Sequence, residues 1–96
     1  MYSLNVTVTN KYGIHARPSA AIVKEATKHE SNIIIRHLKD NITANAKSIL
    51  ELLLLCASCD TDLTVEATGI DEVEAATKVV EVIKNLKTLP EEQDKQ

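Results

Sequence analysis

The chain has 96 residues, enough for one small domain and too few for two. Hydrophobic residues make up 44% and charged residues 26%, the composition of an ordinary globular domain rather than a disordered chain. The net charge is −3, and the only aromatic residues are two tyrosines. Both features argue against a nucleic-acid-binding module, which would carry a basic face and stacking platforms.

The first half of the chain predicts a strand, a helix and a hairpin. Residues 2–9 alternate with the period of a half-buried strand, with an inner face of Leu4, Val6 and Val8. Residues 16–29 predict a helix whose apolar stripe is Ala16, Ala20, Val23 and Ala26. Residues 32–37 and 41–46 predict two weaker strands joined by a turn at 39–41. In the second of these strands, the residues predicted to face inward are Ile42, Ala44 and Ala46.

The second half predicts a helix, a strand and a helix. A short helix from 48 to about 55 opens with the capping box Ser48-x-x-Glu51. Residues 62–68 alternate again, with an inner face of Leu63, Val65 and Ala67. The last helix begins at Asp71, where Asp71 and Glu74 form a D-x-x-E capping pair. Its buried face is predicted to contain Val73, Ala76, Val80 and Ile83, widened by Val79, Val82 and Leu86.

The predicted order is β-α-β-β-α-β-α, and each strand has one polar face. A parallel sheet covered on both sides would lack such faces. We therefore predict an α+β fold, an open-faced β-sandwich with a four-stranded, mostly antiparallel sheet and three helices on one face. Residues 1–88 are expected to form the domain, and residues 89–96 a polar C-terminal tail.

Location and redox state can be predicted from simple features of the sequence. The longest apolar stretch, residues 52–57, is far short of the ~20 residues of a spanning helix. The chain opens without a signal segment, so we expect a cytoplasmic protein that does not insert into membranes. Two cysteines, Cys56 and Cys59, cannot form a disulfide framework and are expected to be reduced thiols.

A histidine is predicted at the start of the first helix. Pro18 fits only the first turn of a helix, which places His15 at or beside the N-cap and Arg17 in the first turn. The positive end of the helix dipole disfavours imidazolium, so a neutral, nucleophilic ring is expected. Backbone N–H groups and Arg17 would stabilise a phosphoryl group on that ring.

Spacing alone leaves a simpler interpretation of His15 open, because a histidine at a helix start is commonly a solvated or capping residue. The sequence lacks the other motifs of a hydrolase site: no carboxylate lies next to His15, and there is no nucleophile elbow or phosphate-binding Gly-rich loop. No cofactor is expected. His29 and His37, flanked by polar residues, are expected on the surface.

Three segments together resemble a known family. Residues 10–18, NKYGIHARP, resemble the active-site signature of the HPr family, the histidine-containing phosphocarriers of the phosphoenolpyruvate-dependent sugar phosphotransferase system. Residues 44–50, ANAKSIL, resemble its regulatory-serine segment, and residues 65–69, VEATG, its last strand and the turn after it. The family's fold is the open-faced sandwich already predicted from the strand alternation.

The resemblance implies a carrier rather than a turnover enzyme. His15 matches the histidine that accepts a phosphoryl group from enzyme I and passes it to the A component of enzyme II. Arg17 matches the arginine that stabilises the phosphoryl group. The resemblance also implies a partner-binding surface beside them, formed by Ala20, Lys24, Ile49, Leu50 and Leu53. A monomer is expected, because one face must meet successive partners.

Leucines at helical spacing usually form core, which competes with this partner surface. Residues 49–50 and 52–55 hold six large apolar side chains, too many for one narrow stripe. Some of them are therefore expected to face water.

Two interpretations of Ser48 stay open. The resemblance implies regulatory phosphorylation by HPr kinase/phosphorylase, with the product acting through a catabolite regulator. A serine that caps a helix needs no further explanation, however. Glu51, where the family usually has a small residue, would repel a phosphate on Ser48, although the helix N-terminus would favour it.

Two further departures from the family pattern are Tyr12, beside the active histidine, and the pair Cys56 and Cys59. A lone C-x-x-C could be a redox pair or half of a zinc site. Because the sequence has neither a second ligand pair nor a thioredoxin-like context, we predict no metal site.

Three functions are open on the sequence alone. The first is a phosphocarrier serving sugar uptake and its regulation. The second is a carrier of the nitrogen-related branch, which delivers phosphoryl groups to a regulatory A component. The third is a regulatory binding protein acting through Ser48 without sugar transport, against which the presence of His15 and Arg17 argues.

Overall fold

The computed structural model describes residues 1–11, 13–55 and 57–86. Its elements occur in the predicted order and are β1 (Tyr2–Thr7), α1 (Ala16–Ala26), β2 (Asn32–His37), β3 (Ile42–Asn45), α2 (Ile49–Leu54), β4 (Asp62–Thr68) and α3 (Glu72–Lys84). The predicted tail, residues 89–96, lies outside the described residues.

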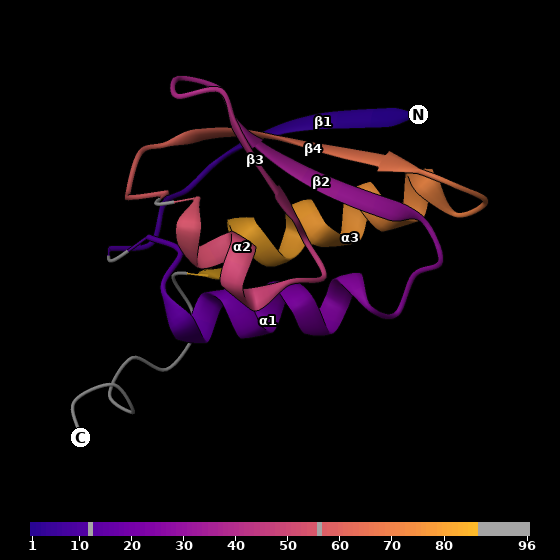
Figure 1. The fold of residues 1–96 in the computed structure, drawn as a ribbon, viewed down its shortest axis with the longest axis horizontal. Helices are drawn as coiled ribbons and strands as arrows, with labels where there is room; N and C mark the ends of the chain where they lie inside the picture. Colours follow the sequence, from indigo (N-terminus) through magenta and orange to yellow (C-terminus); the bar gives the residue numbers. More distant parts are fainter. Residues whose placement is uncertain (12, 56, 87–96) are drawn as a thin grey trace.

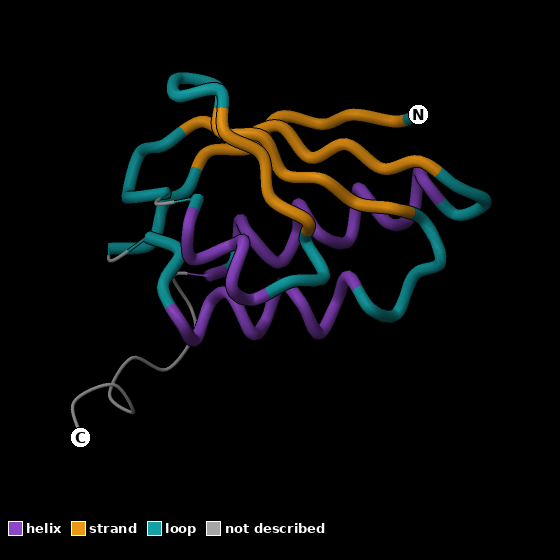
Figure 2. Tube along the Cα trace, in the orientation of Figure 1, coloured by secondary structure: helices purple, strands orange, loops and turns teal. Residues whose placement is uncertain are grey.

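The four strands form one antiparallel sheet in the order β1-β4-β2-β3. Val65 of the inner strand β4 pairs with Leu4 on one side and with Ile35 on the other. All three helices lie on the same side of this sheet (Figures 1 and 2). The predicted open-faced sandwich is therefore confirmed.

The core lies between the sheet and the helix layer, because the strands alternate as the sequence predicted. The inward side chains of the sheet and the helices that cover it are almost fully buried, notably Ile33, Ile35, Leu63, Val65, Ile22, Leu52, Val79 and Ile83. The opposite face carries polar pairs: the Thr64 hydroxyl donates to Asn5 Oδ1 at 2.8 Å, and Arg36 bridges to Glu66. Each strand therefore separates an apolar face from a polar one.

Helix α1 differs from its prediction in length and in its buried face. It ends at Ala26 rather than at residue 29. Thr27 is the C-cap residue, and its hydroxyl donates a hydrogen bond to the Lys24 carbonyl at 3.1 Å. Its buried residues are Pro18, Ser19, Ile22 and Ala26, whereas the predicted stripe members Ala16 and Ala20 are exposed. Ile22 offers much more apolar area than either alanine, and burial of that area sets the rotation of the helix.

Val73 and Ile42, which the sequence predicted in the core, are exposed. Val73 is 54% exposed in the first turn of α3, while Ala75 joins the buried face instead. Ile42 is 41% exposed where it opens the edge strand β3, although Ala44 and Ala46 are buried as predicted. Periodicity shows which face of an element is apolar, but the ends of that face are covered only where a neighbour reaches them.

His29 and His37 are buried, which corrects the prediction that they lie on the surface. Only 8% of His29 and 6% of His37 is exposed. His37 comes after Ile33 and Ile35 on the inner face of β2, so the two-residue period itself placed it inward. Its ring faces Asp40, whose carboxylate lies 3.7 Å from Nε2.

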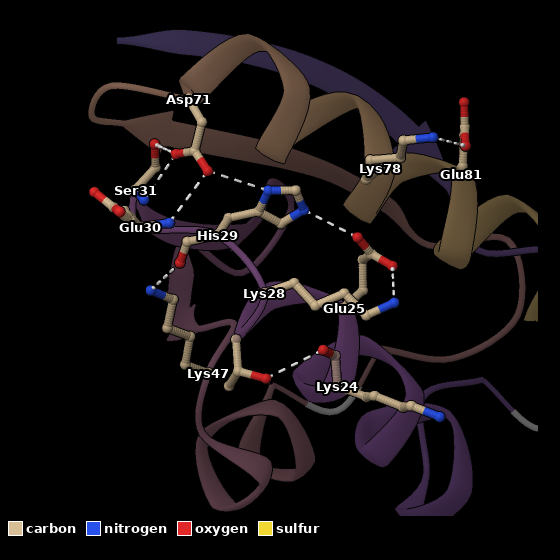
Figure 3. A network of polar contacts seen from close by, with 11 residues as sticks. Lys24, Glu25, Lys28, His29, Glu30, Ser31, Lys47, Asp71, Lys78 and Glu81 are labelled. Carbon is tan, nitrogen blue, oxygen red and sulfur yellow. Dashed lines mark hydrogen bonds and ion pairs between the residues drawn. The ribbon is translucent and has the colours of Figure 1, made fainter.

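The His29 ring lies between two carboxylates that come from different helices (Figure 3). Its Nε2 is 2.9 Å from Glu25 Oε2, and its Nδ1 is 3.2 Å from Asp71 Oδ2. The hydrogen bond from His29 is the main reason that the pKa of Glu25 lies below its ordinary value of 4.5. The ring thus links the end of α1 to the start of α3.

Asp71 is the N-cap residue of α3, but its side chain does not cap the helix as the D-x-x-E pair predicted. Its carboxylate instead accepts hydrogen bonds from the Ser31 hydroxyl and from the N–H groups of Glu30 and Ser31. These bonds, above all the one from the Ser31 hydroxyl, lower the pKa of Asp71 to about 2. The Glu72 carboxylate accepts a hydrogen bond from the Gly69 N–H at 3.1 Å, and this bond supports the turn before the helix.

We predict that Asp71→Asn reduces stability near neutral pH and that this effect fades in acid. A carboxyl whose pKa is lowered by folding stabilises the protein above the unfolded pKa of 3.8, and the stabilisation is lost as the pH falls toward about 2. Urea unfolding of wild type and variant across that range measures the difference. The exposed Asp62→Asn is the control, and a difference that stays constant with pH would contradict the prediction.

Candidate functional site

His15 is the N-cap residue of α1, as predicted, and it has extended backbone angles of φ −107° and ψ −162°. The helical ladder begins with the Ser19 N–H, which donates to the His15 carbonyl at 2.9 Å. Pro18 supplies no N–H, and the first turn contains no acidic residue. The half-buried His15 and Arg17 therefore lie at the positive end of an 11-residue helix.

This arrangement suits an anion attached to the histidine. The first N–H groups of a helix have no partner within its ladder and point outward along its axis. The side chain of His15 does not cap these groups itself. A charged group on the ring would meet the helix dipole and the guanidinium of Arg17, both of which favour negative charge.

The loop before His15 is held by a turn that closes at Gly13. Gly13 donates its N–H to the Asn10 carbonyl at 3.2 Å, and the side-chain amide of Asn10 donates to the Gly13 carbonyl. Gly13 has φ +70°, a conformation that favours glycine. The next residue, Ile14, is buried and donates its N–H to the Ala57 carbonyl at 2.8 Å.

The loop between α2 and β4 presses against this turn. A Cβ atom on Gly13 would lie only 2.7 Å from Ser58 Cα and would clash with the Ala57 carbonyl oxygen. The same two chain segments are also joined at Val8. Its N–H donates to the Thr61 carbonyl at 2.9 Å, and its carbonyl accepts from the Asp60 N–H at 2.7 Å. Two loops that are distant in the sequence therefore fix the entry to α1.

Sequence reasoning missed Asn10 and Ala57 as supports of the site. Asn10 is only 2% exposed, although polar residues surround it in the sequence. A polar residue three positions before a glycine is a recognisable turn signal, which could have drawn attention to it. The contact with Ala57 left no signal, because it depends on how two distant loops pack.

Helix α2 presents several of its apolar side chains to water, as their number predicted. Leu52 and Leu55 are fully buried. The exposed members form what we call the apolar patch, which consists of Ile49 (44% exposed), Leu50 (67%), Leu53 (38%) and Leu54 (63%). Leu54 is the member that the resemblance did not include.

The apolar patch and the start of α1 occupy the same end of the molecule. Helices α1 and α2 are in contact, and Figure 1 shows α2 beside the first turns of α1. Ala20 and Lys24 of α1 are exposed. The fold thus brings α2 beside the part of α1 that carries Arg17 and Ala20, whereas Lys24 lies in the last turn of α1.

Ser48 is the N-cap residue of α2, and its Oγ accepts the Glu51 N–H at 3.2 Å, as the capping box predicted. The Glu51 carboxylate does not return to the Ser48 N–H as in a standard box. It accepts the Asn45 N–H at 2.7 Å instead. A negative charge is therefore held within the first turn that Ser48 opens.

Cys59 is an exposed free thiol whose Sγ lies 3.8 Å from the Thr9 carbonyl oxygen. Tyr12 and Cys56, the other departures from the family pattern, lie outside the described residues. Within the described ranges, no three His, Cys, Asp or Glu side chains are grouped so that they could bind a metal ion. The helices in these ranges are all too short or too polar to cross a bilayer.

Comparison with known proteins identifies the relatives of this chain. A family model described as "PTS HPr component phosphorylation site" matches residues 2–85. The phosphocarrier protein HPr of Treponema pallidum (strain Nichols) is 38% identical over 80 residues, which cover 83% of this chain and 89% of that protein.

Solved structures agree with this result. The crystal structure of HPr-C-His from Thermoanaerobacter tengcongensis matches with a TM-score of 0.84 and 36% identity, over 94% of this chain and 99% of that chain. A crystal structure of an HPr dimer from the same organism matches with a TM-score of 0.69 and 37% identity, over 91% and 98% of the two chains.

The relatives that match this chain, in sequence and in its open-faced sandwich fold, are phosphocarrier proteins of the HPr type. The family model covers every described helix and strand, from the start of β1 to the end of α3. The chain belongs to the HPr family of the phosphotransferase system.

Two leucines of α2 provide a matched test of the apolar patch. Leu52→Ala should lower the free energy of unfolding by about 2 to 5 kcal/mol, because it opens a cavity in the core. Leu50→Ala removes the same atoms from the same helix but should change it by less than about 0.5 kcal/mol, because the side chain is already exposed. Urea denaturation measures both values, and equal losses would contradict the exposure of Leu50.

Proposed function

We propose that this chain is a cytoplasmic phosphocarrier whose His15 accepts a phosphoryl group from phospho-enzyme I and donates it to the A component of enzyme II. The observation that carries the proposal is the position of His15 at the N-cap of α1 in a chain of the HPr family. The bond from phosphorus to the donor breaks as the bond to a ring nitrogen of His15 forms. The second transfer reverses these roles.

Arg17 and the first turn of α1 support the proposed transfer. The added phosphoryl group carries negative charge, which the helix dipole and the guanidinium stabilise. With no acidic residue in that turn, no like charge opposes it there. The chain acts as a carrier that its partner enzymes load and unload, rather than as an enzyme with turnover of its own.

The proposed docking surface consists of Ile49, Leu50, Leu53, Ala20, Lys24 and Arg17. An apolar centre with a basic rim fits short-lived complexes with successive partners. We propose that the carrier acts as a monomer, because a partner needs free access to this end of the molecule. The relatives compared above are named HPr, which favours sugar transport over the nitrogen-related branch.

We predict that incubation with phosphoenolpyruvate and enzyme I adds one acid-labile phosphoryl group to the wild-type chain and none to His15→Ala. Phosphohistidine hydrolyses in acid, whereas phosphoserine does not, so acid treatment before intact-mass analysis separates the two. His37→Gln is the matched control, because it removes a buried histidine from β2 rather than from the site. It should be phosphorylated like the wild type.

Two outcomes would count against the proposed role of His15. A folded wild-type chain that gains no phosphoryl group from a proven active enzyme I would reduce His15 to a capping residue. An acid-labile group that persists in His15→Ala would assign the chemistry to another histidine.

We further propose that Ser48 is a regulatory phosphorylation site for an HPr kinase/phosphorylase, and that the product acts through a catabolite regulator. Ser48 is partly exposed at the N-cap of α2, where the helix terminus would favour a phosphate. The negative charge of Glu51 opposes phosphorylation, because Glu51 lies in the first turn of α2 and its carboxylate is held there by a hydrogen bond from the Asn45 N–H.

We predict that Glu51→Gly raises the rate of Ser48 phosphorylation by an HPr kinase about two- to fivefold, the effect expected for removing one exposed like charge. Glu51→Gln is the matched variant, because it removes the charge but keeps an acceptor for the Asn45 N–H. Glu51→Gln should therefore also raise the rate of Ser48 phosphorylation. A rate that is unchanged or lower in both variants would contradict the repulsion.

A further inference from the structure

We infer that Asn10 is a positioning residue for His15, acting through the backbone of Gly13 and Ile14. This inference rests on the proposed function and adds a residue to it. The hydrogen bonds of Asn10 described above join its side chain and its carbonyl to Gly13, two positions before His15. Its role is to fix the peptide from which the site is built.

Asn10 forms two hydrogen bonds with Gly13. The Gly13 N–H donates to the backbone carbonyl of Asn10, and the Asn10 side-chain amide donates to the carbonyl of Gly13. Both polar groups of Gly13 are thus bound by one residue. Because Gly13 has φ +70° and no side chain, these bonds set the direction in which the chain leaves the turn.

The peptide between Gly13 and Ile14 is held from both sides. Its oxygen is the Gly13 carbonyl, which accepts from Asn10, and its N–H is that of Ile14, which donates to Ala57 at 2.8 Å. His15 is the next residue, and its backbone angles begin α1. A rotation of that peptide would move the imidazole relative to the helix N-terminus.

The side chain of Asn10 is itself incompletely hydrogen-bonded. The residue is 2% exposed, yet its Oδ1 accepts no hydrogen bond within the described part of the chain. A half-satisfied buried amide costs stability and calls for an explanation. The donor on Nδ2 supplies one, since only a donor can bind the Gly13 carbonyl. Asp at this position would keep the shape of the side chain, but near neutral pH it would place a carboxylate oxygen where Asn10 has its Nδ2 donor.

Three variants of Asn10 test how much the site depends on its Nδ2 donor. Asn10→Ala removes the side chain, Asn10→Asp replaces the donor with an acceptor, and Asn10→Ser keeps a hydroxyl donor on a shorter arm. Asn5→Ala is the matched control, because Asn5 lies on the open face of β1, where its Oδ1 accepts from Thr64. Thermal unfolding first establishes a temperature at which each variant is folded.

At that temperature, phosphorylation by enzyme I and phosphoenolpyruvate is measured as kcat and KM for the carrier. We expect Asn10→Ala and Asn10→Asp to lower kcat about tenfold, as a displaced reacting group does, with KM changed less than about twofold because the apolar patch is intact. Asn10→Ser should fall between wild type and Asn10→Ala. If kcat stays at the wild-type value while only the unfolding temperature drops, Asn10 is merely structural and the inference is overturned.

A second readout separates this inference from the proposed function. The NMR signals of the His15 ring and of the Ile14 amide should shift in Asn10→Ala and Asn10→Asp but not in Asn5→Ala. If the wild type takes up no phosphoryl group, the proposed function fails, and these signals alone decide whether Asn10 positions the ring. Unchanged His15 signals in all the folded variants would overturn the inference even where phosphorylation of the wild type succeeds.

Discussion

The contact between the backbones of Gly13 and Ala57 decides where His15 stands. A hydrogen bond from Ile14 to the Ala57 carbonyl and the close approach at Gly13 join the loop before α1 to the loop after α2. Because α1 begins at this junction, the same contact sets the position of the helix N-terminus relative to the apolar patch. The chemistry assigned to His15 and the docking surface assigned to α2 are therefore coupled through one pair of backbones.

The other end of α1 is held by a different kind of interaction. There the His29 ring joins Glu25 to Asp71, and Asp71 also binds the backbone at Glu30 and Ser31 (Figure 3). Hydrogen bonds in which one partner is ionised are stronger than those between two neutral groups. Helix α1 is thus tied to α3 at its C-terminal end, opposite the end that carries His15.

Helix α2 serves two purposes with one set of leucines. Leu52 and Leu55 bind the helix to the core, while the apolar patch remains open to water. Exposed apolar patches are typical of protein–protein interaction sites, in line with the docking surface proposed above. Glu51, the acidic residue among these side chains, is held by the Asn45 N–H, which keeps its charge close to Ser48.

Local patterns in the sequence were enough to predict the order of the elements, the apolar faces of the strands and the position of His15. These features depend on local rules: alternation shows which strand face is apolar, and Pro18 permits only the first turn of a helix. The same rules showed that α2 carries more leucines than one buried face can hold. His37 could also have been placed inward by alternation, although its polar neighbours suggested otherwise.

Local patterns could not predict the rotation of α1, the burial of His29, the role of Asp71 or the residues that support the site. Each depends on a partner that is distant in the sequence: Asp71 lies 42 residues from His29, and Ala57 lies 43 residues from Ile14. The pattern of a single helix shows an apolar stripe, but the largest side chain and the neighbouring elements choose which stripe is buried. Local sequence therefore determines which residues are available for the site, and long-range packing determines how they are held.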